Sequence, residues 1–297
     1  MVIIDNLVKN YGGFRLNVSM EIPNGTVTGI IGKNGAGKTT IIKAILGLIR
    51  PDEGHVTING IESTALSGAD KAGIGVALSD SGFSRYLDLK DVICILKKMY
   101  PTFDEDFFRK SCAAQGLALD KKLKDYSTGM HAKLRVLTAI SHKADLLIMD
   151  EPTAGLDVEA RNEVLDMLRQ YLSDNENCSI LLTSHISSDI ESLCDDIYLI
   201  NDGKIILHED TDNVLSNYAI LKVNEDDYEK LDKSYILSTK KENFGYVCFT
   251  NEKQFYVDNY PDIVIENGKI DDLILMMTGG KKHAWSFSKG SKDCTYT

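Results

Sequence analysis

Apolar and polar positions near the start of the chain follow first a strand period and then a helical one. They alternate from Leu16 to Ile22, which predicts a half-buried strand, and Pro23-Asn24-Gly25 predicts a turn after it. Thr26 to Ile31 is a short apolar, β-branched run that stops at a glycine-rich loop. The apolar residues from Ile41 to Ile49 then have helical spacing. This stretch therefore predicts a strand, a loop and a helix in succession.

Two later apolar runs, Leu146 to Met149 and Ile180 to Thr183, predict buried strands. The first run ends in two acidic residues and the second in Ser184-His185. Because these strands alternate with helical patterns, we expect an α/β core with largely parallel strands, entered through an early antiparallel portion. The segments with helical spacing are Leu89 to Met99, Glu105 to Gln115, Met130 to His142 and Glu159 to Leu172.

After about Ile206 the pattern changes to polar segments and short strand-like runs. Asn224 to Lys233 is strongly polar, whereas Phe244 to Thr250 and Ile263 to Ile265 have the composition of short strands. We therefore expect a small accessory α+β domain over residues 218–280.

The rest of the chain is divided accordingly. We expect one large domain over residues 1–217, with a helical subdomain at about 80–142. Residues 281–297 carry four lysines, with Trp285 and Phe287 between them. This composition predicts either a flexible basic tail or a contact with lipid headgroups or with a partner.

Charge and hydropathy limit the partners of the chain. It has 33 basic and 44 acidic residues, a net charge of −11, so we expect no nucleic-acid partner and no general attraction to an anionic bilayer. No apolar run approaches the roughly 20 residues that span hydrocarbon, and the amino-terminal residues lack the pattern of a secretory signal. The six cysteines form no C-x-x-C pair, which favours reduced thiols in a cytoplasmic protein.

The glycine-rich loop from Gly32 to Thr39 fits the pattern G-x-x-x-x-G-K-[ST] at every fixed position. Its glycines allow backbone N–H groups to approach the oxygens of a triphosphate, and the helix that follows adds its positive dipole end. We expect Lys38 to bridge the β- and γ-phosphates and Thr39 to ligate Mg²⁺. The alternative is a strand-to-helix turn without a ligand. Further expected nucleotide contacts are Asn34, Gly35, Ala36, Gly37 and Thr40.

The acidic pair Asp150-Glu151 follows the apolar run that begins at Leu146. Such a pair alone is often part of a solvated loop, but with a phosphate loop present it predicts the second half of a nucleotide site. We expect Asp150 to hold Mg²⁺ through its water shell. Glu151 is expected to polarise the attacking water.

Together these motifs resemble the nucleotide-binding subunits of ATP-binding-cassette (ABC) transporters, over about residues 1–215. The resemblance implies a P-loop NTPase fold of the ABC type, with an antiparallel β portion, a parallel-sheet core and an α-helical signature subdomain. It also implies that Tyr11 stacks on adenine, although a surface tyrosine beside a Gly-Gly turn is the alternative. His185 resembles the histidine that contacts the γ-phosphate and positions the catalytic water.

Two further segments carry the resemblance. Tyr126-Ser127-Thr128-Gly129-Met130 stands where the family has its signature, usually LSGGQ, at the start of a helix. The resemblance implies that Ser127 and Gly129 face the γ-phosphate of an ATP held by a second subunit. Asp157, at the end of Ala154-Gly155-Leu156-Asp157, resembles the anchor of the loop that crosses the dimer interface. A chain with one phosphate loop and one signature is therefore expected to dimerise.

One motif departs from the family. Ser79 stands where the family usually has a glutamine that ligates Mg²⁺ and senses the membrane subunit. Ser79 or the neighbouring Asp80 could contact the metal or its water, because hard cations accept oxygen ligands of both types. The departure implies slow hydrolysis, or a partner subunit that carries a more standard site.

The resemblance implies a function as well as a fold. We expect an ATPase that uses ATP and Mg²⁺, acts as a homodimer or a heterodimer with a related ATPase, and drives separate integral membrane subunits from the inner face of the plasma membrane. The signature Y-S-x-G-M without a coupling glutamine is most similar to ATPases that export drugs and antimicrobial or toxic peptides. Open alternatives are an importer, a lipid-linked polymer exporter, a soluble ABC protein acting on ribosomes or DNA, and a cassette that binds ATP without hydrolysing it.

Overall fold

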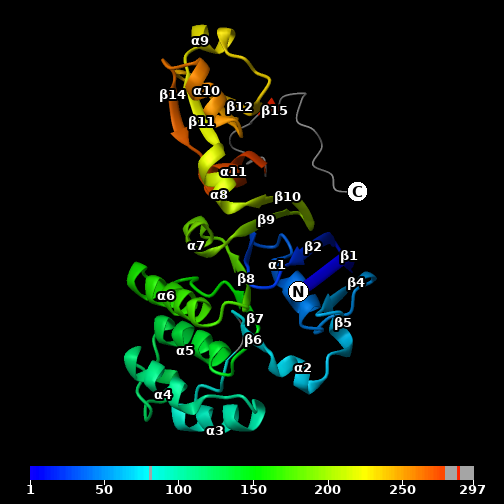
Figure 1. Cartoon of the computed structure of the whole chain (residues 1–297), viewed down its shortest axis with the longest axis vertical. Coiled ribbons are helices and arrows are strands. Elements are labelled where there is room, and N and C mark those ends of the chain that lie inside the picture. The colour runs from blue at the N-terminus through cyan, green and yellow to red at the C-terminus, as the bar shows by residue number, and fades with distance from the viewer. Residues whose placement is uncertain (80–81, 278–285, 288–297) are drawn as a thin grey trace.

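The computed structural model of the chain describes residues 1–79, 82–277 and 286–287. It contains a ten-stranded and a five-stranded sheet, with helices packed against both (Figure 1). The large sheet and its helices form the lower part of Figure 1, and the smaller sheet forms the upper part. No helix among these described residues has both the length and the apolar character needed to cross a membrane.

The ten-stranded sheet has the order β5-β4-β1-β2-β10-β9-β3-β8-β7-β6. The strands from β5 to β2 pair antiparallel, whereas β9, β3, β8, β7 and β6 are parallel to one another, which confirms the predicted antiparallel entry and parallel core. Between the two portions, β10 is parallel to β2 and antiparallel to β9. The strands are β1 (Val2–Tyr11), β2 (Phe14–Ile22), β3 (Val27–Ile31), β4 (Glu53–Ile58), β5 (Ile61–Glu62), β6 (Ile74–Ala77), β7 (Leu146–Asp150), β8 (Ser179–Ser184), β9 (Asp196–Asn201) and β10 (Lys204–Asp210).

The helices of this part of the chain lie close to the predicted segments, with the group α3, α4 and α5 forming the helical region at the bottom of Figure 1. The α3 helix has the predicted bounds because Asp88 caps its first turn and forms a capping box with Asp91. The helices are α1 (Lys38–Ile45), α2 (Gly68–Ala72), α3 (Leu89–Met99), α4 (Glu105–Ala114), α5 (Thr128–Ile140), α6 (Val158–Asp174) and α7 (Ser187–Leu193), with 3₁₀ turns η1 (Ser63–Ala65) and η2 (Leu123–Asp125).

The helix predicted over Ile41 to Ile49 is wrong at both ends. It begins at Lys38, inside the phosphate loop, and ends at Ile45. Gly47 has a φ of 64°, and the N–H groups of Gly47 and Leu48 donate to the carbonyls of Ala44 and Lys43. This Schellman arrangement ends the helix before the last apolar positions of the pattern.

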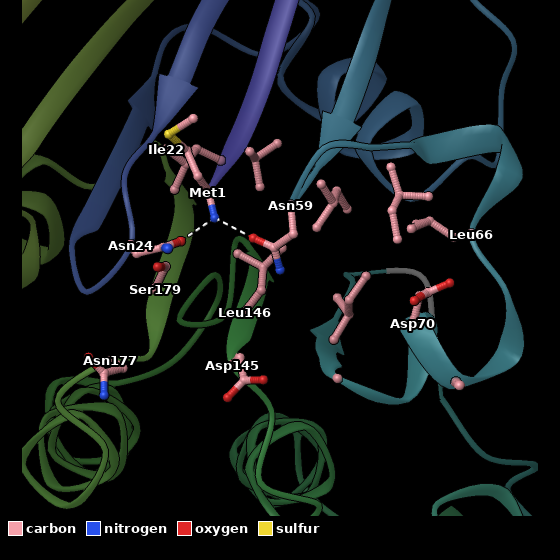
Figure 2. A pocket seen from close by; sticks show the side chains of 16 residues that line it. Met1, Ile22, Asn24, Asn59, Leu66, Asp70, Asp145, Leu146, Asn177 and Ser179 are labelled. Atoms are coloured by element: carbon pink, nitrogen blue, oxygen red, sulfur yellow. Dashed lines mark hydrogen bonds between the residues drawn. The ribbon is translucent and has the colours of Figure 1, made fainter.

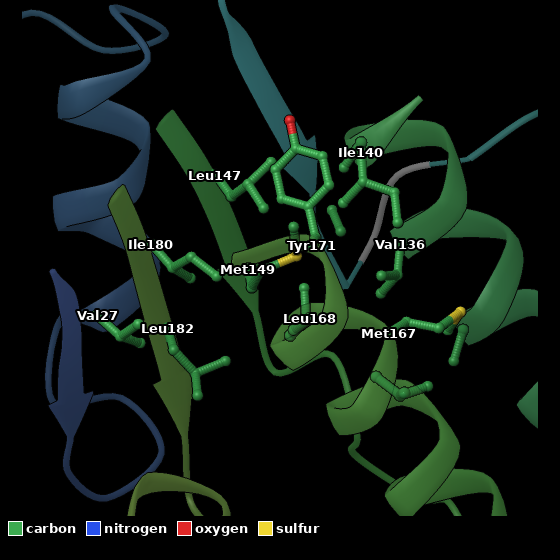
Figure 3. Close-up of a cluster of buried hydrophobic side chains, with 14 of the residues drawn as sticks. Val27, Val136, Ile140, Leu147, Met149, Met167, Leu168, Tyr171, Ile180 and Leu182 are labelled. Atoms are coloured by element: carbon green, nitrogen blue, oxygen red, sulfur yellow. The ribbon is translucent and has the colours of Figure 1, made fainter. Parts of the chain in front are cut away.

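Strands at the centre of the large sheet are buried on both faces. Leu147 and Met149 of β7 point into one apolar cluster with residues of α5 and α6, whereas Leu146 and Ile148 belong to a second cluster on the α1 side. Figure 3 shows the first cluster, in which Leu168 of α6 lies beside the side chains of β7 and β8. A strand covered on both faces is a continuous apolar run in sequence, which is the pattern that predicted β7.

The smaller sheet has the antiparallel order β14-β11-β13-β12-β15. Its first four strands and two helices follow in the chain order β-α-β-β-α-β, a split β-α-β arrangement. The strand predicted from Phe244 begins one residue later, and β11, β12 and both helices have no counterpart in the predicted elements. These elements are β11 (Ala219–Val223), α9 (Glu225–Lys230), β12 (Ile236–Glu242), β13 (Gly245–Thr250), α10 (Lys253–Asn259), β14 (Val264–Asn267) and β15 (Ser286–Phe287).

Two helices lie between the sheets. They are α8 (Thr211–Asn217) and α11 (Ile270–Met277). Tyr218, Phe249 and Leu273 are buried in the same apolar cluster as the helices of the large sheet, so the two parts share one core. The domain boundary at residue 218 stays a prediction, and the predicted tail at 281–297 lies outside the described residues except for β15.

Candidate active site

The phosphate loop lies between β3 and α1, and its glycines are required by its geometry. Gly35 and Gly37 have φ values of 82° and 120°, where a side chain would be strained. A Cβ at Gly32 would lie 2.4 Å from the carbonyl oxygen of Ile200. No side chain caps the first turn of α1, so its N–H groups remain available to phosphate oxygens.

Lys38 extends along this loop toward the acidic residues of β7. Its Nζ donates to the Gly32 carbonyl oxygen at 2.7 Å and lies 3.3 Å from Glu151 Oε1. Only 7% of the Lys38 side chain is exposed. A shielded ammonium group at the phosphate loop provides the charge that phosphate oxygens need.

Three hydroxyl side chains surround the carboxylate of Asp150 at the end of β7. Asp150 is 2% exposed, and its Oδ1 accepts a hydrogen bond from Thr183 Oγ1 at 2.7 Å. Its Oδ2 lies 3.4 Å from both Thr39 Oγ1 and Ser79 Oγ. One carboxylate with hydroxyl groups beside it fits Mg²⁺, which is usually bound by one or two carboxylates together with water and substrate phosphates. Asp80 lies outside the described residues.

Glu151 and His185 are in direct contact. Glu151 Oε2 accepts from the backbone N–H of His185 at 3.2 Å and pairs with its Nδ1. The backbone N–H of Glu151 donates to the carbonyl and hydroxyl oxygens of Thr183, both at 3.1 Å. Glu151 has a φ of 51°, and strained backbone of this kind is concentrated at functional sites.

These side chains converge because β3, β7 and β8 are parallel neighbours whose carboxyl ends share one edge of the sheet. They enclose a cleft of about 460 Å³. Most of the predicted nucleotide contacts in the phosphate loop line this cleft, whereas Ala36 is buried and is not among the lining residues. The lining residues are Phe14, Lys33, Asn34, Gly35, Gly37, Lys38, Thr39, Thr40, Ser79, Asp150, Glu151, Ala154 and His185.

The aromatic residue in the cleft is Phe14. Tyr11 is 44% exposed at the end of β1 and does not line the cleft, although it pairs with Phe14 in the strand register. The role of Tyr11 at adenine therefore stays a prediction. Phe14 was missed in the sequence, where the only signal is an aromatic residue on each side of the Gly12-Gly13 turn.

The predicted dimer contacts lie outside this cleft. Ser127 and Asp157 cap the first turns of α5 and α6, accepting from the N–H groups of Met130 at 3.2 Å and Ala160 at 2.8 Å. A Cβ on Gly129 would lie 3.2 Å from Cβ of Ala160, so these two helix starts are adjacent. Helix capping explains both side chains within the chain, and their contact with a partner's nucleotide stays a prediction.

A larger groove of about 750 Å³ continues from the cleft past Ser79 and Glu151 toward α5. Arg85, His131 and Arg135 line it. Burial and the two neighbouring guanidinium groups hold the pKa of His131 below its usual value. Arg85 and Arg135 therefore place two positive charges in this groove beside Glu151, whereas the lowered pKa favours the neutral form of His131.

A further cleft of about 420 Å³ lies at the opposite edge of the large sheet, where β6, β7 and β8 begin (Figure 2). The amino group of Met1 donates there to the side-chain oxygens of Asn24 and Asn59. Among the predicted site residues that the structure describes, none lines this cleft. The candidate active site is therefore the cleft at the carboxyl edge.

Known proteins with related sequences identify the family. Residues 16–154 match the family model described as "ABC transporter", and residues 122–188 match one described as "AAA domain, putative AbiEii toxin, Type IV TA system". The linearmycin resistance ATP-binding protein LnrL of Bacillus subtilis is 32% identical over 69% of this chain and 68% of its own length. This chain belongs to the ATP-binding proteins of ABC transporters.

Other relatives of this ABC ATPase have similar names. The lantibiotic transport ATP-binding protein SrtF of Streptococcus pyogenes is 35% identical over 71% of this chain and 92% of its own length. The bacitracin transport ATP-binding protein BcrA of Enterococcus faecalis is 32% identical over 68% of this chain and 67% of its own. Membership confirms the predicted ATP-binding and ATPase activities.

Solved structures confirm the ABC ATPase fold. An ATP-binding subunit of an ABC transporter aligns with a TM-score of 0.64 and 24% identity, covering 72% of this chain and 91% of that one. A dimeric bacterial ABC transporter cassette aligns with a TM-score of 0.63 and 21% identity, covering 71% of this chain and 99% of that one.

Proposed function

We propose that this ABC ATPase powers the export of an antimicrobial peptide or drug through separate membrane subunits. The observation that carries the catalytic part is the convergence of Lys38, Asp150, Glu151 and His185 on one cleft. The cargo class is supported by the names of its relatives, which concern linearmycin resistance, lantibiotic transport and bacitracin transport.

Each residue of the cleft would have a separate role in hydrolysis. Lys38 and the N–H groups of the loop hold the phosphates, while Glu151 accepts a hydrogen bond from the attacking water and takes up its proton. His185, in contact with Glu151, fixes the direction of that carboxylate. Thr39, Asp150 and Ser79 would hold Mg²⁺ at the ends of their elements. When bound, the metal neutralises charge on the phosphate oxygens.

A second ATP-binding subunit would complete this site. Ser127, Gly129 and Asp157 lie outside the chain's own cleft, although the resemblance assigns them to phosphate and to the dimer interface. A partner subunit, either a second copy or a related ATPase, would bring the same residues to this cleft. The dimer would then act at the inner face of the plasma membrane through its membrane subunits.

The decisive experiment has a biochemical and a cellular arm. The tagged chain is purified from detergent-solubilised membranes of its source cell, and its ATPase rate is compared with and without the co-purifying proteins. We expect a polytopic membrane protein that changes the rate. In cells, deletion of the gene should raise sensitivity to a lantibiotic, bacitracin or linearmycin, and the wild-type gene should restore resistance where Glu151→Gln does not. Recovery of ribosomes or soluble proteins only would overturn the transport proposal.

A further inference from the structure

The α7 helix begins two residues after His185, and its Asp189 is almost completely buried, with 1% exposure. Arg161 Nε donates to Asp189 Oδ1, and Thr153 Oγ1 donates to Oδ2. Ser184 Oγ lies 3.2 Å from the same Oδ2. One buried carboxylate therefore joins three segments of the chain.

Each of these partners lies close in sequence to a residue of the cleft or of the predicted interface. Thr153 follows Glu151 by two positions, Ser184 precedes His185, and Arg161 lies on α6 just after Asp157. Ser184 Oγ also accepts from the N–H of Ile186 at 3.0 Å, so it supports the chain on both sides of His185. Asp189 does not line the cleft and can act only through these neighbours.

The other side of α7 meets the carboxyl-terminal part of the described chain. The α11 helix, at the base of the upper sheet in Figure 1, packs against α7. Leu273 of α11 is 1% exposed and shares an apolar cluster with Ile190 of α7. The N–H of Ile270 donates to Glu191 Oε1 at 3.1 Å. The α7 helix is thus held between the catalytic segments and the part that carries the second sheet.

We propose that residues 218–277 form a positioning module for ATP hydrolysis. The α11 helix fixes the position of α7. Asp189 of α7 then keeps the segments that carry Glu151 and His185 in a fixed position relative to each other. Asp189 is a positioning residue in this scheme. A displacement of the second sheet would then move α7, and through it Glu151 and His185, while the phosphate loop keeps its position. The proposal rests on the hydrolytic roles assigned above to Glu151 and His185.

The test compares two leucines on one helix. Leu273 faces α7, whereas Leu275 is 53% exposed on the same helix. In the full chain, Leu273→Ala should lower kcat by about 10- to 100-fold, because small displacements of reacting groups cost up to about 100-fold. The KM for ATP and the Kd for ADP should stay unchanged, since the phosphate loop is untouched. Leu275→Ala, which removes the same atoms, should leave kcat at the wild-type value.

A second pair of variants tests Asp189 itself. Asp189→Asn keeps the size of the side chain and removes its charge, and should also lower kcat without changing ADP affinity. If α11 and Asp189 act through the same helix, the combined Leu273→Ala and Asp189→Asn variant should lose less activity than the product of the two single losses. Independent, multiplicative losses would contradict the shared route.

The outcomes separate this inference from the proposed function. If Glu151→Gln still hydrolyses ATP, the catalytic assignment fails. If Glu151→Gln is inactive but Leu273→Ala and Leu275→Ala both retain wild-type kcat, the positioning role is overturned. Thermal unfolding shows whether each variant is folded. If Leu273→Ala does not fold, Glu191→Ala replaces it, because it removes only the acceptor of the Ile270 contact, and an unchanged kcat in that variant overturns the proposal.

Discussion

At the scale of single residues, both carboxylate oxygens of Glu151 are engaged by cationic or donor groups of the chain itself. Oε1 lies 3.3 Å from Lys38 Nζ, and Oε2 accepts from His185. The sequence predicted these three residues because each belongs to a short local motif. It could not predict Thr183 as a neighbour of Asp150, since that contact depends on the register between β7 and β8. Nor could it predict that Phe14, rather than Tyr11, lines the cleft.

Removing the charge of Glu151 should stop turnover but not binding. We expect Glu151→Gln to lower the hydrolysis rate by about 10²- to 10⁴-fold, the range for loss of a general base. Phosphate release measures the rate, and binding of labelled ATP serves as the control. Hydrolysis at the wild-type rate would rule out the proposed role.

Lys38 should matter for binding more than for folding. Lys38→Ala removes the ammonium group beside the phosphate loop, and we expect nucleotide affinity to fall by roughly 10- to 100-fold, as for the loss of a hydrogen bond to a charged group. A titration with labelled ATP measures this, with thermal unfolding as the control. Unchanged affinity would place the triphosphate elsewhere.

Ser79 offers a test of the departure from the family. Its hydroxyl oxygen lies 3.4 Å from Asp150 Oδ2, so a longer amide side chain at this position should reach the same metal site. We expect Ser79→Gln to change the Mg²⁺ concentration that gives half-maximal ATPase activity, while ATP binding without metal stays constant. An identical Mg²⁺ titration in both proteins would argue against a metal contact at Ser79.

At the scale of elements, local capping residues determine where helices begin and end, whereas some strands are defined by their pairing with other segments. The bounds of α3 follow from its own sequence, because Asp88 and the apolar period agree. The end of α1 is also local, because Gly47 terminates the helix although the apolar spacing continues beyond it. The burial of β11 alternates, but one of its outward positions is the apolar Ile220, and β12 is mostly polar. Neither sequence therefore shows a clear strand pattern, and their pairing becomes visible only in the sheet.

A buried histidine that follows α5 should make stability depend on pH. His142 is 1% exposed and stacked on Tyr100, with ring nitrogens 3.2 Å from the Thr138 carbonyl oxygen and 3.4 Å from that of Ile74. Burial lowers the pKa of His142 below its usual value despite these two acceptors. Below about pH 6.5 the unfolded chain therefore takes up a proton that the folded chain resists.

We accordingly expect the free energy of unfolding to fall as the pH drops through about 6.5 and below, where the unfolded histidine becomes charged. The His142→Asn variant cannot take up this proton and should lose less stability over the same range. Urea unfolding at pH 8, 7, 6 and 5 measures both proteins. Parallel curves would show that His142 does not contribute to the pH dependence.

At the scale of the whole molecule, one sheet edge collects the catalytic residues and one apolar core joins the two sheets. The site was predictable because its motifs lie at the ends of consecutive buried strands, where the fold class brings them together. The packing of α11 against α7 could not be predicted, because it depends on how the part of the chain with the second sheet folds back onto the first part. In sequence, Leu273 begins a continuous apolar run to Met277, so the pattern does not show which face of this helix is buried.

The place of β3 in the sheet has a consequence for synthesis on the ribosome. This apolar strand has β8 on one side and β9 on the other, and both follow residue 178. Translation adds about 5 to 20 residues per second, so roughly 10 to 30 s pass between the synthesis of β3 with its phosphate loop and that of β8 and β9. During that interval the nascent chain exposes an unpaired hydrophobic strand, and ATP cannot yet stabilise it because the acidic half of the pocket is incomplete.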